Sequence, residues 1–322
     1  MPIWTQGSGW GDQMGKRVGD FKKSMEPRIK EVRFSLAKIR KSPLSLVGIA
    51  IILFFITIAI FAPWIAPPED PDDPYQIPHD GYSPIPKPPD DDHPFGTTGY
   101  QYDMFYGCIW GTRTAFRICI LVIGAALLIG ITLGSIAGYF GGIVDEVIMR
   151  VVDVFMAFPY LILAMAFSVA FGRSIDSIMY ALILVTWPTY TRLMRGNILS
   201  VREEDYIGAA RANGCSSGKI ILKHVIPNSI YPVLIMASLD IGAVVLTAAA
   251  LSFLGLGAPI GYADWGQLTS FSRDYITGIT GDPFIYWHTV IIPGLFMLFF
   301  VLGWNLLGDA LRDIMDPMLR RK

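Results

Sequence analysis

Long runs of apolar residues, free of Asp, Glu, Lys and Arg, are separated along the chain by polar segments. A helix needs about 20 consecutive apolar residues to cross a bilayer core. Four runs meet this requirement without a charge. A fifth is interrupted only by Asp240, and a sixth is short unless it extends past Arg192, whose long side chain can reach the interface. The pattern predicts an all-α membrane protein with six transmembrane helices, at residues 42–68, 118–144, 154–172, 177–191, 229–257 and 283–308.

Composition supports this assignment and narrows the function. Hydrophobic residues make up 52% of the chain and charged residues 16%, against roughly 25% charged in soluble domains. The sequence contains no HExxH, GxSxG or P-loop motif, and the glycines at 138–142 lack the lysine of a phosphate-binding loop. We therefore expect a chain that is not an enzyme and binds no cofactor or metal. If it transports actively, the energy must come from an ion gradient or from another subunit.

Lys and Arg residues are concentrated on one side of the predicted crossings. Of 26 in the chain, 21 fall in residues 1–43, at Arg150, in residues 192–223 or after Gly308. Cytoplasmic flanks of membrane helices retain positive charge, so both termini are predicted to be cytoplasmic. The predicted organisation is a basic arm (1–43), a first transmembrane helix (44–65), an extracytoplasmic loop (66–112), a membrane core (113–308) and a cytoplasmic tail (309–322).

The loop between the first two crossings is rich in proline and acid. Residues 66–95 contain ten of the 22 prolines, and residues 69–103 carry nine acids against Lys87 alone. Such a segment cannot form a helix or a central strand. Two interpretations stay open: a solvated linker, favoured for 67–89, and a docking surface or a collar over a pore, favoured for the aromatic stretch 93–107. His79 and His93 lack the spacing of metal ligands.

The stretch "SVREEDYIGAARANGCSSGKIILKHVIPN" interrupts the apolar pattern with a charged, glycine-containing segment. Ser200 and Glu203 form a capping box that predicts the start of a helix. Gly214 lies just past the predicted end of this helix, where a residue in the left-handed conformation commonly caps a helix. Ser216 can cap the start of a second helix, which Pro227 is predicted to end. Residues 200–228 are thus predicted to form a helical hairpin. On its first helix, spacing places Tyr206, Ala209, Ala210 and Asn213 on one face, where small residues permit close approach of another protein.

Three interpretations of the hairpin compete. A DNA-binding helix-turn-helix is set aside, because the hairpin is tethered between membrane crossings and carries only four basic residues against three acids. A simple connecting loop would not need thirty residues of capped helix. The remaining interpretation is a coupling element that transmits force from a cytoplasmic engine.

Several segments together resemble one family. They are the hairpin, "GYFGGIVDEVIMRVVDVFMAFP", "TWPTYTRLMRGNILS", "ALSFLGLG", "DWGQLTSFSRDY" and "PGLFMLFFVLGWNLLGDALRDIMDP". They are similar to the permease subunits of binding-protein-dependent ABC importers, in the dipeptide, oligopeptide and nickel branch, and most of all to that branch's second permease subunit. The resemblance implies a type I ABC importer permease fold, with the hairpin as its EAA-type coupling element.

The resemblance also implies roles for hairpin residues. The family's Ala-Ala pair and glycine sit in a groove on the ATPase subunit, and its proline closes the second helix. Gly208 stands where the family usually has a glutamate, so the nearby acids are the expected substitutes for its polar contact. In the acidic loop, Tyr102 stands where the branch more often has an arginine. The implied ATPase-coupling residues are Glu204, Asp205, Tyr206, Ala209, Ala210, Arg211, Gly214 and Pro227.

The partners implied by the resemblance are a homologous second permease forming a heterodimer, two ATPase subunits that carry ATP and magnesium, and an extracytoplasmic solute-binding protein. The assembly would lie in a prokaryotic plasma membrane. Peptides are the first expectation for the solute, with oligosaccharides or nickel as alternatives.

Three charged residues fall within predicted crossings: Asp153, Asp240 and Arg117. Charges are costly in lipid and usually face a bundle interior or water. Each could line a translocation path. For Asp153 a structural pair with nearby Arg150 is the favoured alternative. Asp240 also fits a different class of protein, a proton-coupled secondary carrier, which would need such a carboxylate.

Overall fold

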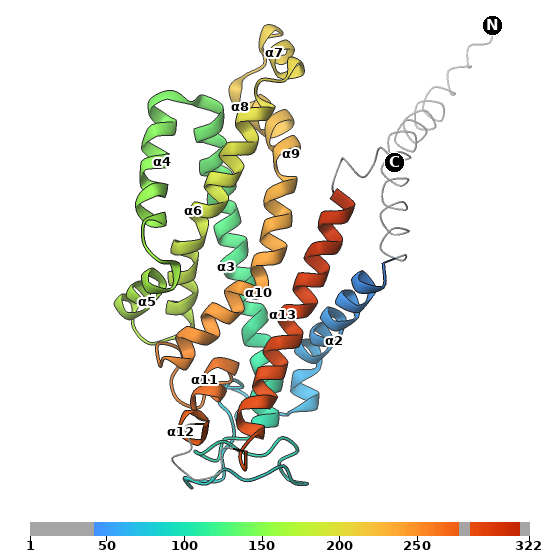
Figure 1. Cartoon of the computed structure of the whole chain (residues 1–322), viewed down its shortest axis with the longest axis vertical. Coiled ribbons are helices and arrows are strands. Elements are labelled where there is room, and N and C mark those ends of the chain that lie inside the picture. Colours follow the sequence, from blue (N-terminus) through green and yellow to red (C-terminus); the bar gives the residue numbers. More distant parts are fainter. Residues whose placement is uncertain (1–41, 277–283, 316–322) are drawn as a thin grey trace, which may run out of the picture.

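The computed structural model describes residues 42–276 and 284–315, and these are helical apart from turns, loops and three isolated β-bridges. The basic arm at the start of the chain lies outside the described residues. Long helices run along the molecule, together with one shorter helix that is turned across it (Figure 1). They are α2 (Pro43–Ile65), α3 (Met104–Phe140), α4 (Gly142–Met156), α5 (Tyr160–Phe171), α6 (Ile175–Val201), α10 (Tyr231–Phe253) and α13 (His288–Met315).

Four of the described helices, α2, α3, α10 and α13, are long and apolar enough to cross a membrane. The α4 and α5 pair makes a fifth span if the two count as one, although they are bent by 90°. The crossing predicted at 154–172 is therefore not one continuous helix, because Pro159 has no N–H with which to continue α4 and instead caps α5. The sixth predicted crossing corresponds to α6, which has 27 residues but carries Asp176, Arg192 and Arg195.

The centre of the bundle is the contact between α3 and α6. Gly130, Gly134 and Gly138 recur every four residues on the face of α3 that meets α6. A methyl group added at Gly134 would lie 2.6 Å from the carbonyl oxygen of Thr191. Glycine therefore lets the two backbones approach closely, as small residues do between membrane helices. The α6 side chains at this contact are fully buried, among them Tyr190 and Ile198.

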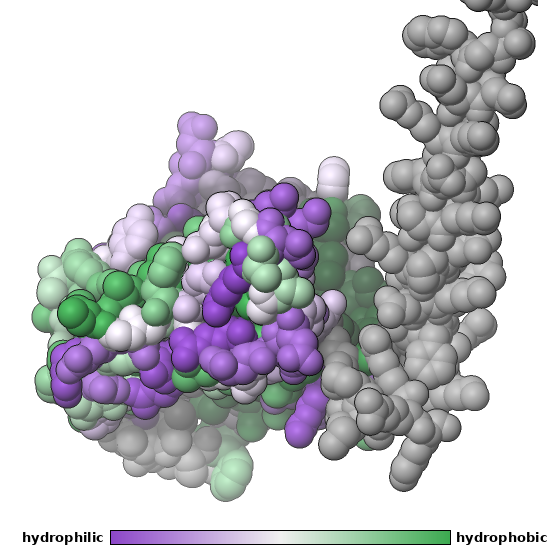
Figure 2. Space-filling model, turned by 90° about the horizontal axis from the view of Figure 1, so that it is seen from above, coloured by the Kyte–Doolittle hydropathy of each residue, from purple (hydrophilic) through white to green (hydrophobic). Residues whose placement is uncertain are grey.

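Polar residues gather at the two ends of the molecule. One end holds α7 (Asp205–Ala212), α8 (Ser217–Ile220), a π-helical turn (Ile221–Val225) and α9 (Ile226–Ser229). Seen from this end, the surface is largely hydrophilic, with hydrophobic patches beside it (Figure 2). The other end holds the acidic loop (66–103), α11 (Trp265–Ser270) and α12 (Arg273–Ile276) (Figure 1).

The acidic loop is folded onto its neighbours. The backbone N–H of Ile77 donates to the carbonyl oxygen of Gly261 at 2.8 Å, and that of Ala263 donates to the carbonyl of Tyr75 at 2.7 Å. Tyr75 also stacks on Tyr262, with 5.2 Å between ring centroids. Most of residues 67–89 are exposed, as expected for a solvated linker, but residues 75–77 are fixed to the connection that follows α10, which supplies partners that the sequence alone could not reveal.

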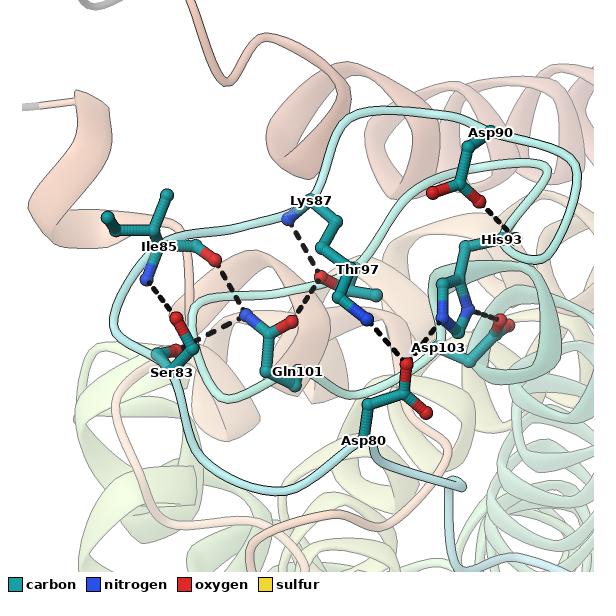
Figure 3. Close-up of polar contacts among 9 residues, drawn as sticks. All are labelled: Asp80, Ser83, Ile85, Lys87, Asp90, His93, Thr97, Gln101 and Asp103. Atoms are coloured by element: carbon teal, nitrogen blue, oxygen red, sulfur yellow. Dashed lines mark hydrogen bonds and ion pairs between the residues drawn. The ribbon is translucent and has the colours of Figure 1, made fainter.

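A histidine clamp closes the acidic loop (Figure 3). His93 Nδ1 lies 2.7 Å from Asp103 Oδ2, and His93 Nε2 lies 2.9 Å from Asp80 Oδ2. Lys87 Nζ donates to the same Asp80 oxygen at 2.6 Å. Asp103 in turn caps α3, since its Oδ1 accepts the N–H of Tyr106 at 2.6 Å. The clamp therefore links the loop to the first turn of the central helix.

The clamp favours a charged histidine. Burial opposes the charged form of His93, but hydrogen bonds to Asp103 and Asp80 outweigh it and raise the pKa of His93. The hydrogen bond from Lys87, followed by that from His93, lowers the pKa of Asp80. Negative and positive side chains thus alternate along the clamp, from Asp103 through His93 and Asp80 to Lys87. The strength of these ion pairs depends on pH, because His93 must be protonated to carry its charge.

We predict that Gly134→Ala destabilises the folded chain by about 1–3 kcal/mol, because the added methyl group overpacks the contact between α3 and α6. The midpoint of thermal unfolding in detergent measures the effect. Gly124→Ala is the matched control on the same helix, since a methyl group there meets no atom within 4 Å. Equal stability of the two variants would contradict the close approach.

We also predict that the acidic loop loosens as pH rises. A raised histidine pKa contributes stability that is complete below about pH 6.5 and is lost as pH passes the raised value. The lowered pKa of Asp80 contributes stability that is lost only in strong acid. Amide hydrogen-exchange protection of residues 80–103 should therefore fall as pH rises above about 6.5. His93→Gln should abolish that change; an unaltered pH dependence in this variant would rule out the clamp as its cause.

Candidate functional site

The candidate site is the hairpin formed by α7, α8, the π-helical turn and α9 at one end of the bundle (Figure 1). Its predicted start at a capping box is wrong. Ser200 lies inside α6, which continues to Val201, and α7 begins at Asp205 after Glu204 in an extended conformation. The helix overruns the box because buried Ile198 packs against Gly138 of α3, and this contact holds the last turn of α6.

The turn of the hairpin agrees with the sequence expectation. Gly214 has a φ of +74°, in the left-handed region. Its N–H donates to the carbonyl of Arg211 at 2.9 Å, and the N–H of Cys215 donates to the carbonyl of Ala210 at 3.2 Å. These two bonds form a Schellman motif, which satisfies carbonyls at the end of α7. The turn is therefore fixed by the backbone and needs a residue that accepts positive φ.

The second arm differs from the prediction at its end. Ser216 precedes α8 as expected, but Pro227 does not terminate the arm, which continues through α9 to Ser229. A proline ring normally clashes with the carbonyl four residues earlier. Here the turn before it is a π-helix, Ile221–Val225, whose wider winding relieves that clash. The arm is thus a bent but continuous helical rod that leads into α10.

The hairpin rests on a buried apolar base. Ile207, Ile220 and Val225 are buried in the same core cluster as the centre of α6. Ala210 is half-buried against this cluster while Ala209 is exposed, so the predicted pair does not share one open face. The remaining coupling residues that the sequence singled out are all exposed: Glu204, Asp205, Tyr206, Arg211, Gly214 and Pro227.

Two arginines join the hairpin to the end of α3. Arg202 Nη1 donates to the carbonyl oxygen of Gly138 at 2.9 Å. The guanidinium of Arg211 lies over the ring of Tyr139, 5.2 Å from its centroid, in a cation–π contact. Sequence reasoning placed Arg211 on the hairpin but missed both contacts, since neither Gly138 nor Tyr139 is near in sequence. A partner that moves the hairpin would therefore also move α3.

The charged residues predicted within the crossings are mostly paired. Arg192 Nη2 donates a hydrogen bond to Asp153 Oδ1, so the prediction that Asp153 pairs with Arg150 is wrong. Arg150 Nη2 lies 3.8 Å from Glu146 Oε1 instead. The helix spacing favoured Arg150, but the packing of α4 on α6 brings the other arginine closer. Arg117 pairs with an acid at the start of α6, Asp176, at 2.7 Å.

Asp240 is the exception among these charges. Its Oδ2 accepts a hydrogen bond from the hydroxyl of Tyr190 at 3.0 Å. Among the described residues no basic side chain forms an ion pair with it. The structure therefore separates the three predicted pathway residues into two ion-paired groups and one carboxylate held by a tyrosine.

Comparison with known proteins agrees with this architecture. Residues 130–321 match the family described as binding-protein-dependent transport system inner membrane component. Residues 34–89 match the N-terminal TM domain of oligopeptide transport permease C. The first match covers more than half of the chain and includes the whole hairpin.

Curated relatives cover nearly the whole chain. A dipeptide transport system permease protein of Alkalihalophilus pseudofirmus is 37% identical over 89% of this chain and 90% of its own length. A probable D,D-dipeptide transport system permease protein of Escherichia coli K12 is 36% identical over 89% of this chain and 93% of its own. An oligopeptide transport system permease protein of Bacillus subtilis is 31% identical over 94% of this chain and 95% of its own length.

A solved structure supports the fold. The inward-facing MetNI methionine ABC transporter aligns with a TM-score of 0.53 at 17% identity, covering 66% of this chain and 98% of the other. At that identity the likeness concerns the fold alone. Together with the family match, it shows that the chain belongs to the permease subunits of binding-protein-dependent ABC importers, which span the membrane while separate ATPase subunits hydrolyse ATP.

Proposed function

We propose that the chain is one of two homologous permeases in a peptide importer, with its hairpin seated on a cytoplasmic ATPase subunit. The observation that carries the proposal is an exposed helical hairpin fixed by a Schellman turn and anchored to α3 by Arg202 and Arg211. Such an element can transmit a displacement because its base is packed rather than flexible. Peptide as the solute is supported by the names of the relatives.

In this proposal the hairpin and both termini face the cytoplasm, as the distribution of Lys and Arg favours. Two ATPase subunits carry ATP and magnesium. Their closure pushes the hairpin, and the helices that it joins turn the path from one side of the membrane to the other. ATP hydrolysis by partner subunits also removes the need for the proton coupling considered from the sequence.

The acidic loop would then face outward and receive the solute-binding protein. The loop exposes Tyr82 (81%), Ile85 (60%) and Tyr100 (48%), and it also carries a run of three exposed aspartates, 90–92. Exposed aromatic residues with charges around them are typical of protein contact surfaces. The folded loop therefore supports the docking interpretation of this segment over a plain linker.

The test is dipeptide uptake into proteoliposomes that hold the complete transporter and its binding protein. Wild-type complex should accumulate dipeptide only with ATP. Ala209→Glu should lower this uptake by at least tenfold and weaken ATPase association, because it places a charge and bulk on the exposed docking face. Its thermal stability should stay unchanged, since the site is exposed.

Gly208→Glu is the matched control, because it adds the same side chain one residue earlier, at an exposed position where the resemblance to the family implies a glutamate. This variant should retain uptake. Normal uptake by Ala209→Glu would overturn the docking role of the hairpin. Uptake of dipeptide by wild-type complex without ATP would overturn the proposed function itself.

A further inference from the structure

Polar side chains from three helices come together inside the bundle. The hydroxyl of Tyr160, at the start of α5, lies 3.1 Å from the hydroxyl of Thr186 on α6. One turn further along α6, Tyr190 donates to Asp240 Oδ2 on α10 at 3.0 Å. Thr186 and Tyr190 are buried, while Tyr160 is 40% exposed and Asp240 is partly exposed. The group thus has a buried side and an accessible side.

Asp240 differs from the acids of α4 and α6. Asp145, Asp153 and Asp176 each form an ion pair with an arginine. Asp240 has no such pair within residues 42–276 and 284–315, and its Oδ1 accepts no hydrogen bond there. A carboxylate at membrane depth is costly unless it meets water or a positive charge. The Asp240 carboxylate is therefore free to meet a cation that comes from outside the described part of the chain.

The surroundings of Asp240 leave that side of α10 open. Towards the end of the helix, Ala243 is exposed, Leu246 is 46% exposed, and the Thr247 hydroxyl is occupied by the carbonyl of Ala243 at 2.8 Å. Ala243 and Thr247 follow Asp240 at helical spacing on one face. The carboxylate is thus the one charged group on an otherwise small and uncharged stripe.

Tyr190 fixes the direction of the carboxylate. The tyrosine is fully buried, and the glycine row of α3 makes room for it, since a methyl group at Gly130 would lie 2.5 Å from its Cβ. Because Oδ2 of Asp240 is held by the tyrosine hydroxyl, Oδ1 is left for a second donor. An ammonium group offers several N–H donors and a full positive charge, so it suits this oxygen.

We propose that Asp240 binds the positively charged amino terminus of a peptide in transit, with Tyr190 as its positioning residue. The inference rests on the proposed function, peptide import. The peptide supplies the missing cation only while it passes, so the site is occupied transiently and does not need to be tight.

The experiment measures dipeptide molecules imported per ATP hydrolysed by the reconstituted complete transporter. Asp240→Asn keeps an oxygen that can accept the Tyr190 hydroxyl but removes the charge. We expect it to lower the ratio about tenfold, the loss of one charge-assisted hydrogen bond, while ATPase activity and thermal stability are maintained. Asp240→Glu should restore most of the ratio. Asp176→Asn, at the exposed ion pair with Arg117, is the matched control and should change the ratio less than twofold.

A merely structural role gives the opposite pattern. If Asp240 only holds Tyr190, Asp240→Asn is tolerated and Tyr190→Phe is the damaging variant, and that result would overturn the inference. If wild-type complex imports no dipeptide with ATP, the proposed function falls and the inference falls with it. If wild-type import is normal and Asp240→Asn matches it, the inference alone falls.

Discussion

The close approach of α3 and α6 is the contact on which the rest of the structure depends. Three glycines, Gly130, Gly134 and Gly138, remove the side chains that would otherwise separate the two backbones. With the helices at this distance, Tyr190 is directed towards α10 and Ile198 is buried at the base of the hairpin. The positions of Tyr190 and of the hairpin base therefore depend on the three glycines. Membrane helices associate through close packing rather than through a hydrophobic driving force, so the row of glycines decides how near α6 can lie to α3.

The same pair of helices connects the two ends of the molecule. At one end Asp103 caps α3 and belongs to the histidine clamp of the acidic loop. At the other end Arg202 and Arg211 join the hairpin to the last turn of α3. A displacement of the hairpin is thus applied to α3, which begins at the acidic loop. The ion pair between Arg195 and Asp145 also links α6 to α4. This continuity gives the proposed coupling a physical route.

Much of this could be predicted from sequence where the determinants are local. Apolar runs specified the membrane class, and the positive φ of Gly214 followed from its place after a helix. Most predictions that failed did so where distant segments decide, although one failed on a local feature. No helix starts at the predicted capping box of Ser200, because α6 continues through it. Pro227 does not end a helix, because a π-helical turn precedes it. The ion-pair partner of Asp153 is Arg192, which lies on another helix. The glycine row was not recognised in the sequence, because its four-residue spacing does not show which helix packs against it.

The central claim is that the hairpin contacts an ATPase subunit, and photo-crosslinking tests it most directly. A photoreactive amino acid replaces Ala209 in the complete transporter, and a second variant carries it at Tyr82, which is 81% exposed at the opposite end. The account predicts an adduct with an ATPase subunit from position 209 and none from position 82. An ATPase adduct from position 82, or none from position 209 in a complex that imports dipeptide, would contradict it.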